Sequence, residues 1–196
     1  MSLCVGVLGL QGDFALHAAM LKRLKVRSKT VRRPDDLTDC AGLILPGGES
    51  TTLMKLMAET GLDEGIKTFA AGHAVMGTCA GLIMLSAGLI GEKKVTPLGL
   101  IDIEAERNAY GRQVDSFVDR VRVPVFKDGK DFEAVFIRAP RIRFMGEGVK
   151  AMARHRDEVV MARNERVLVM TFHPELTRDA RIHEYFVKEM VMKSRF

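Results

Sequence analysis

The chain has only three cysteines among its 196 residues, Cys4, Cys40 and Cys79, and none of them forms a C-x-x-C pair. An odd number of widely spaced cysteines favours neither a disulfide framework nor a structural zinc site. We therefore expect the protein to work in a reducing cytoplasm.

Long hydrophobic runs are also absent. No apolar stretch approaches the roughly 20 residues that a membrane-spanning helix requires, and the chain opens without a basic and apolar signal pattern. We expect a soluble protein that has no membrane segment. Hydrophobic residues still make up 47% of the chain, which at this length suits one compact domain covering residues 1–196.

Positive charge exceeds negative charge, and the formal net charge is +5. Such an excess raises the question of an acidic partner such as nucleic acid. The basic residues are spread out, however, and form neither a long tract nor a recognisable nucleic-acid module. We interpret them mainly as a solvated surface, with contact to an acidic partner subunit as the alternative.

Three common ligand-binding motifs are missing. Gly6, Gly9 and Gly12 do not form the dinucleotide motif G-x-G-x-x-G, no G-x-x-x-x-G-K-[ST] phosphate loop is present, and His183-Glu184 lacks the second histidine of a zinc protease helix. We therefore expect no cofactor and no metal. Three further histidines are interpreted as core or surface residues: His17, His73 and His155.

The first half of the chain alternates strand and helix patterns. Buried strands are predicted at 3–10, 42–45 and 74–78, and helical spacing follows the first two at 13–24 and 53–57. This alternation indicates a parallel sheet covered by helices.

The second half changes character after about Gly91, with strand patterns separated by short turns and a helix only at 181–192. The predicted strands are 98–103, 117–125, 132–137, 149–153, 159–162 and 167–171. The expected fold class is therefore α/β: a three-layer, flavodoxin-like or Rossmann-like fold with a mixed, mainly parallel central sheet and an added antiparallel region.

The segment Gly77-Thr78-Cys79-Ala80-Gly81 places a cysteine between two glycines, where a strand pattern meets a helix pattern. A nucleophile at such a turn forms a nucleophile elbow. The glycines leave room for the bend, and the free N–H groups of the helix start favour a thiolate. By itself the motif is compatible with a reactive thiol or with an inert buried cysteine.

A second candidate segment lies near the C-terminus, where a strand pattern is followed by His173, Pro174 and Glu175. Residues two apart in an extended chain point to the same side. We expect His173 to take the proton of Cys79 while Glu175 orients the imidazole. Alone, this segment would be an ordinary solvated turn; with the elbow, it predicts a Cys-His-Glu triad.

This order of residues resembles the triad-type (class I) glutamine amidotransferases, and within them the glutaminase subunits of pyridoxal 5'-phosphate synthase. Five separated segments carry the resemblance over essentially the whole chain. They are Gly9-Leu10-Gln11-Gly12, LPGGESTT at 45–52, RNAYGRQVDSF at 107–117, FIRAP at 136–140 and TFHPE at 171–175.

The resemblance implies hydrolysis of L-glutamine to L-glutamate and ammonia through a glutamyl thioester. It also implies delivery of the ammonia to a (β/α)8-barrel synthase subunit in a hetero-oligomer that makes pyridoxal 5'-phosphate. One departure is Leu16, which precedes His17 where the family commonly has glutamate. A salt bridge from this helix to a partner is therefore in doubt.

Further site residues follow from this comparison. The backbone N–H groups of Ala80 and Gly48 are the expected oxyanion donors. Gln11 is assigned to oxyanion support or to partner contact. Arginine suits the α-carboxylate of glutamine, and Arg107 is preferred for it, because a surface ion pair is the alternative for Arg138. The resemblance implies a glutamine pocket lined by Gly47, Gly48, Glu49, Arg107, Ile137 and Arg138.

Two alternatives remain. The first is a glutaminase of histidine or purine biosynthesis, against which the segment 107–117 speaks. The second is a non-catalytic regulatory subunit, against which the intact Cys79, His173 and Glu175 speak.

Overall fold

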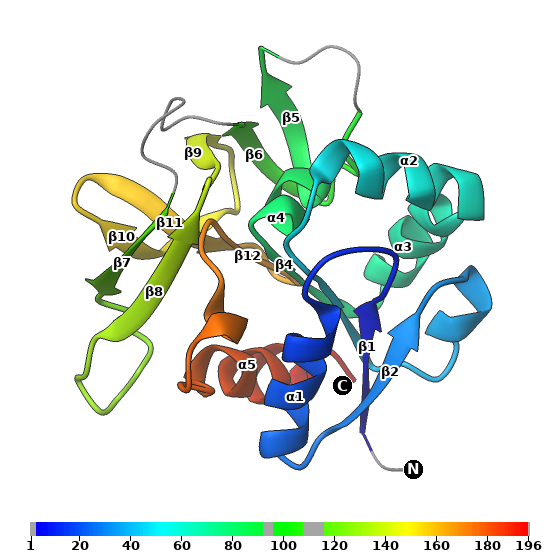
Figure 1. Cartoon of the computed structure of the whole chain (residues 1–196), viewed down its shortest axis with the longest axis horizontal. Helices are drawn as coiled ribbons and strands as arrows, with labels where there is room; N and C mark the ends of the chain where they lie inside the picture. Colours follow the sequence, from blue (N-terminus) through cyan, green and yellow to red (C-terminus); the bar gives the residue numbers. More distant parts are fainter. Residues whose placement is uncertain (1–2, 92–95, 108–115, 196) are drawn as a thin grey trace.

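A twisted seven-stranded sheet forms the centre of the computed structural model, which describes residues 3–91, 96–107 and 116–195 (Figure 1). Its strand order is β10-β11-β12-β4-β3-β1-β2. Strands β12, β4, β3, β1 and β2 pair in parallel, and β11 and β10 extend the sheet antiparallel. The strands are β1 (Cys4–Leu8), β2 (Arg27–Val31), β3 (Gly42–Leu45), β4 (Ala74–Thr78), β10 (Lys150–His155), β11 (Glu158–Arg163) and β12 (Val167–Met170).

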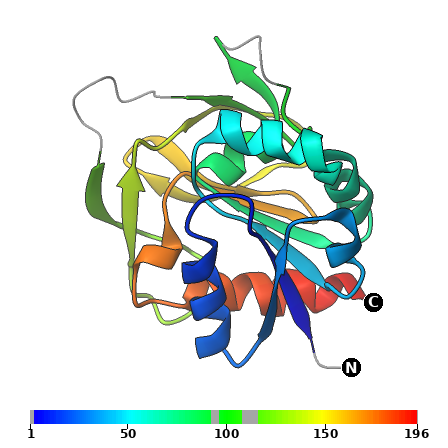
Figure 2. The same cartoon turned by 45° about the vertical axis from the view of Figure 1, so that its right-hand side comes forward.

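Helices cover both faces of this sheet (Figure 2). One face carries α1 (Phe14–Arg23) and the C-terminal helix, which is α-helical in α5 (Arg181–Tyr185) and π-helical over Phe186–Val191. The other carries α2 (Ser50–Thr60), α3 (Leu62–Ala70) and α4 (Ala80–Leu85). Short 3-10 turns occur at Pro34–Leu37, Pro174–Leu176 and Lys193–Arg195.

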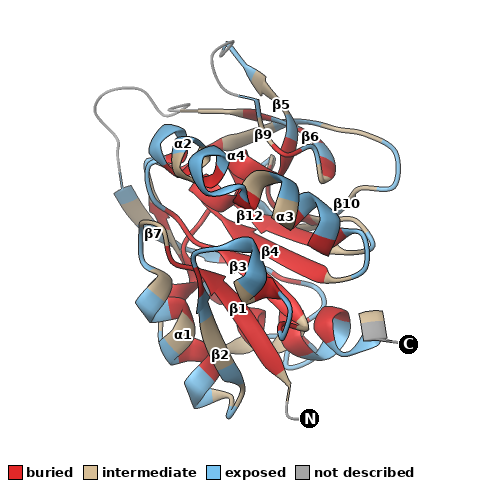
Figure 3. Cartoon of the chain, turned by 90° about the vertical axis from the view of Figure 1, so that its right-hand side faces the viewer, coloured by how far each residue is buried: buried red, intermediate tan, exposed pale blue. Residues whose placement is uncertain are grey.

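The two faces bury separate hydrophobic cores, because successive side chains of a strand point to opposite sides. In β3, Leu43 and Leu45 pack toward α2, α3 and α4, whereas Ile44 packs toward α1 and the C-terminal helix. The central strands are accordingly buried along their whole length (Figure 3). This double burial explains why they are continuous apolar runs in the sequence.

Among the described residues, two smaller sheets are formed by strands that lie between residues 86 and 145. One contains β5 (Ser86–Ile90), β6 (Ile101–Glu106) and β9 (Arg141–Met145), and the other is the hairpin of β7 (Ser116–Val121) and β8 (Phe132–Ile137). The hairpin is tied to the central sheet where the N–H of His173 donates to the carbonyl of Val135 over 2.8 Å. The end of β8 therefore lies beside the carboxyl ends of β4 and β12.

The α/β class and the mixed, mainly parallel sheet are confirmed, and so are the strands predicted at 42–45, 74–78 and 132–137. Four elements were not predicted: β2, α3, β5 and β9. The expected antiparallel region is correct for β7 to β11, but β5 pairs with β6 in parallel. The strand predicted at 98–103 begins only at Ile101, and the one predicted at 117–125 ends at Val121. None of the described helices is long and apolar enough to cross a membrane.

Candidate active site

Cys79 occupies a sharp turn between β4 and α4. Its backbone has φ 50° and ψ −104°, a conformation that side chains rarely adopt. The two flanking glycines make the turn sterically feasible. A Cβ on Gly77 would lie 2.6 Å from the backbone of Gly81, and one on Gly81 would lie 2.1 Å from the carbonyl oxygen of Leu45. The elbow geometry expected from the sequence is present, and strain of this kind is typical of functional sites.

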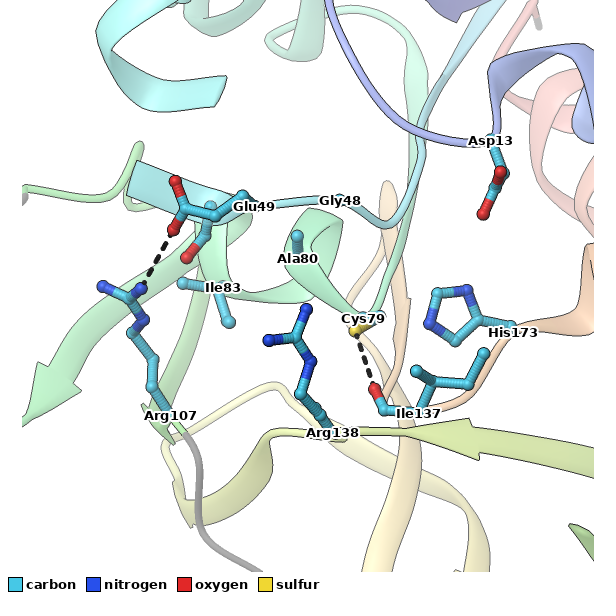
Figure 4. A pocket seen from close by; sticks show the side chains of 11 residues that line it. Asp13, Gly48, Glu49, Cys79, Ala80, Ile83, Arg107, Ile137, Arg138 and His173 are labelled. Carbon is cyan, nitrogen blue, oxygen red and sulfur yellow. Dashed lines mark hydrogen bonds and ion pairs between the residues drawn. The ribbon is translucent and has the colours of Figure 1, made fainter. Parts of the chain in front are cut away.

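The thiol of Cys79 is 8% exposed and opens into a pocket of about 360 Å³. Its Sγ lies 3.8 Å from the carbonyl oxygen of Ile137 at the end of β8. Figure 4 shows this contact, with the imidazole of His173 beside the sulfur. The pocket brings together most of the site residues named from the sequence: Gly48, Glu49, Cys79, Ala80, Arg107, Ile137, Arg138 and His173.

The imidazole of His173 is held by a buried carboxylate. Its Nδ1 lies 2.7 Å from Oε1 of Glu175, and both residues are at most 5% exposed. The pair does not meet along an extended strand as expected. Within residues 173–175, only His173 has an extended backbone. Pro174 begins a 3-10 turn, which brings Glu175 back to the imidazole. The spacing of two residues was right, but the local structure inferred from it was wrong.

The second ring nitrogen of His173, Nε2, is buried and lacks a hydrogen-bond partner among the described residues. In Figure 4 it faces the sulfur of Cys79. Burial alone lowers the pKa of this imidazole, but the negative forms of Cys79 and Glu175 outweigh burial and raise the pKa to about 10. At neutral pH the site therefore favours the imidazolium form of His173.

The loop after β3 passes directly over this imidazole. A Cβ on Gly47 would lie 2.4 Å from Cε1 of His173, so only glycine fits there. Gly48 has φ 154°, and the next backbone N–H, that of Glu49, donates to Oε1 of Gln11 over 3.2 Å. Gln11 thus lies behind the loop and holds it in place.

The carboxylate of Glu49 caps α2. It accepts hydrogen bonds from the N–H groups of Thr51 and Thr52 and from the hydroxyl of Thr52, over 2.6–3.1 Å. The bond from the Thr52 side chain is the largest cause that lowers the pKa of Glu49 to about 2. A fixed negative charge therefore stands at the rim of the pocket.

The two arginines of the site differ in their partners. Nη2 of Arg107 lies 3.3 Å from Oε1 of Glu49. Arg138 has φ 41°, and its guanidinium makes no hydrogen bond or ion pair with any described residue, although it lines the pocket (Figure 4). Most of the signature that begins at Arg107, residues 108–115, lies outside the described residues.

Sequence reasoning did not assign Ser50 and Ile83, which line the pocket, nor two ionisable residues that lie close to the His173-Glu175 pair. Asp13, just before α1, lines the pocket, and its carboxylate lies within 4.8 Å of ligand atoms of His173 and Glu175. We assign no metal to this group, because Nδ1 of His173 already bonds Glu175. The other residue is His17, a fully buried side chain that contacts Glu175. Asp13 could have been suspected from its position after a strand end, whereas His17 carries no such signal.

A cysteine elbow, a histidine-carboxylate pair and a glycine loop at the carboxyl ends of parallel strands define a glutamine amidotransferase fold and site. The chain belongs to the SNO glutamine amidotransferase family, whose model matches residues 7–192.

Two relatives and one solved structure are consistent with membership of this family. The chain is 49% identical over 190 residues to the pyridoxal 5'-phosphate synthase subunit PdxT of Thermosipho africanus, covering 96% of this chain and 99% of that protein. It is 46% identical over 192 residues to the PdxT subunit of Brevibacillus brevis, covering 97% and 98%. A crystal structure described as a glutamine amidotransferase matches with a TM-score of 0.89 and 45% identity, covering 94% of this chain and 97% of that one.

Proposed function

We propose that this chain hydrolyses L-glutamine to L-glutamate and ammonia, and that it supplies the ammonia for the synthesis of pyridoxal 5'-phosphate (vitamin B6). Membership of the SNO glutamine amidotransferase family supports the reaction, and relatives named as synthase subunits support the pathway. The observation that carries the proposal is the strained Cys79 elbow facing a buried His173-Glu175 pair in one pocket.

The proposed reaction begins when the Cys79 thiolate adds to the side-chain amide carbon of glutamine. The imidazolium of His173 then gives its Nε2 proton to the departing nitrogen, the C–N bond breaks, and ammonia leaves a glutamyl thioester behind. His173 next takes a proton from water as the water attacks the thioester, which releases glutamate and restores the thiolate. Glu175 stabilises the charged imidazole throughout.

Both steps pass through a tetrahedral oxyanion, which needs hydrogen-bond donors. The N–H of Ala80 follows the nucleophile at the start of α4, and the N–H of Gly48 lies in the loop that lines the same pocket. We assign these two groups to the oxyanion hole. Gln11 supports that assignment indirectly, because it anchors the next peptide of the loop.

Recognition of free glutamine requires a cation for its α-carboxylate and an anion for its α-ammonium. Arg138 is the better candidate for the carboxylate, because its guanidinium has no described partner, whereas Arg107 is paired with Glu49. We therefore assign the α-carboxylate to Arg138 and the α-ammonium to Glu49, with Arg107 holding Glu49 in place. Gly47, Gly48 and Ile137 are assigned to the remaining wall of the glutamine pocket.

The ammonia acceptor in this proposal is a (β/α)8-barrel synthase subunit that forms a hetero-oligomer with this chain in the cytoplasm. The word "subunit" in the names of the relatives supports a partner. The identity of 46–49% to these relatives also disfavours a glutaminase of histidine or purine biosynthesis. The single domain covering 1–196 remains part of the proposal.

The proposal is tested by measuring glutamate release from L-glutamine by the chain alone and with the barrel subunit. L-Asparagine, one methylene shorter, is the matched control. We expect glutamate from glutamine and no aspartate from asparagine. Failure to release glutamate at saturating partner would leave the alternative of a non-catalytic subunit.

A further inference from the structure

Two buried histidines lie behind the proposed triad. His17, on α1, places Nε2 at 3.4 Å from Oε2 of Glu175 and at 3.3 Å from the hydroxyl of Thr78. Its other nitrogen, Nδ1, lies 2.9 Å from Nε2 of His183 on α5. Both histidines are fully buried. The two oxygens of Glu175 thus face different imidazoles, Oε1 that of His173 and Oε2 that of His17.

The hydrogen-bond chemistry of this cluster selects one tautomer. Oε2 of Glu175 has no other polar contact among the described residues, and a carboxylate oxygen only accepts. The proton of His17 therefore belongs on Nε2, the atom that lies near both Glu175 and Thr78. Nδ1 is then bare and accepts from the Nε2–H of His183.

The surroundings of His183 support the same placement of the protons. Nδ1 of His183 is buried without a described partner. With both histidines protonated on Nε2, Nδ1 of His183 carries no proton. With both protonated on Nδ1, His183 would bury an unpaired N–H, and the unprotonated Nε2 of His17 would face the Glu175 carboxylate. Both features of this second arrangement are unfavourable.

Both imidazoles are neutral. Burial, followed by the neighbouring His183 and His173, holds the pKa of His17 well below its usual value. Burial also lowers the pKa of His183 to about 3. The other titratable groups facing the cluster are Glu175 and His173, with Asp13 and Cys79 beyond them. His17 thus places a neutral N–H donor 3.4 Å from Oε2 of Glu175 without adding a positive charge beside it.

We propose that His17, oriented by His183, is a positioning residue that keeps the carboxylate of Glu175 aligned on His173. This inference rests on the proposed function, because it adds a member to the same set of side chains. Without His17, Oε2 of Glu175 would be buried with no N–H group near it, and the carboxylate could rotate away from Nδ1 of His173. His173 would then lose its anionic partner, and Cys79 would lose its imidazolium.

The test compares His17→Leu with His17→Gln, because the amide of glutamine can replace the Nε2 donor and leucine cannot. The first readout is the rate at which iodoacetamide alkylates Cys79 as a function of pH, followed on the Cys79 peptide by mass spectrometry. We expect the midpoint to move up by about one pH unit or more in His17→Leu and to stay at the wild-type value in His17→Gln. The second readout is kcat for glutamine, which should fall about ten- to a hundredfold in His17→Leu with little change in KM.

A folded His17→Leu protein with the wild-type alkylation midpoint would overturn the inference. A His17→Gln protein with the same alkylation midpoint and kcat as His17→Leu would also overturn it, because His17 would then act only through packing. If His17→Leu does not fold, nitrogen-15 NMR of wild-type histidines decides: a neutral Nε2–H form supports the inference, and an Nδ1–H or charged form overturns it. The alkylation midpoint and the NMR spectrum need no glutamine turnover, so a wild-type chain that fails to hydrolyse glutamine would refute the proposed function separately.

Discussion

The backbone of Gly47 packs against the imidazole of His173. A Cβ at residue 47 would lie 2.4 Å from Cε1 of that ring and 3.1 Å from its Nδ1. On the far side, the carbonyl oxygen of Gly47 lies 1.9 Å from the place of a Cβ on Gly12. The loop proposed to bind the oxyanion is therefore in direct contact with the imidazole proposed to transfer protons.

Gly47→Ala should lower kcat for glutamine by about a hundredfold, because a methyl group must displace either the ring or the loop, and a shift of about 1 Å costs that much. Gly47 is not among the glycines with positive φ, so the effect is steric. Gly72→Ala is the matched control, since a Cβ there meets nothing within 4 Å. An active Gly47→Ala enzyme would show that this contact is not needed.

Arg138→Ala should raise KM for glutamine by about one to two decades, because it removes a charge-assisted contact worth roughly 1.5–3 kcal/mol. Arg107→Ala should raise KM less, since Arg107 is paired with Glu49. Steady-state kinetics of both variants, with the surface substitution Arg143→Ala as control, would measure this order. A larger rise in KM for Arg107→Ala than for Arg138→Ala would show that Arg107 binds the carboxylate.

The raised pKa of His173 predicts a pH-dependent stability. The folded pKa is about 10, against about 6.5 in an unfolded chain. The folded state therefore binds the proton more tightly, and the resulting stabilisation is complete below about pH 6.5 and is lost as pH rises through about 10. The Tm difference between wild type and His173→Gln should shrink over that window. A difference that grows with pH would contradict the assigned imidazolium.

A partner should raise kcat by ordering the loop over the site. Glycine at 47 and 48 leaves that peptide free to rotate, and one oxyanion donor is worth on the order of 10²–10³ in rate. The isolated chain is therefore expected to be weakly active, with the Gln11 region and α1 forming part of the contact. Steady-state assays with and without saturating barrel subunit test this. Equal kcat values would mean that the loop is a fixed oxyanion hole.

The sequence predicts β3 and β4 well because they face a core on both sides and are continuous apolar runs. It predicts β8 well because apolar residues alternate there between a buried and a more exposed face. It fails for β2 and β9, where charged residues such as Arg27, Lys29 and Arg141 occupy partly exposed strands. β5 was missed because Ser86–Ile90 continues the apolar run of α4 without a break.

The site shows the same division. Cys79 and its glycines could be recognised because a sharp turn imposes local residue types. The 3-10 turn at Pro174 and the contact of His17 with His183, 166 residues away in sequence, depend on tertiary packing that no local pattern encodes. The chemical roles assigned to these side chains remain predictions.

The most direct test of the central claim is glutamine hydrolysis by Cys79→Ala in complex with the barrel subunit. The matched control is Cys40→Ala, which removes a thiol whose pKa burial raises to about 11. Partner binding by both variants should be measured alongside, because each loses only one sulfur of packing. We predict that glutamate release is abolished in Cys79→Ala and retained in Cys40→Ala, with partner binding nearly unchanged in both. Glutamate release by Cys79→Ala at the wild-type rate would contradict the account.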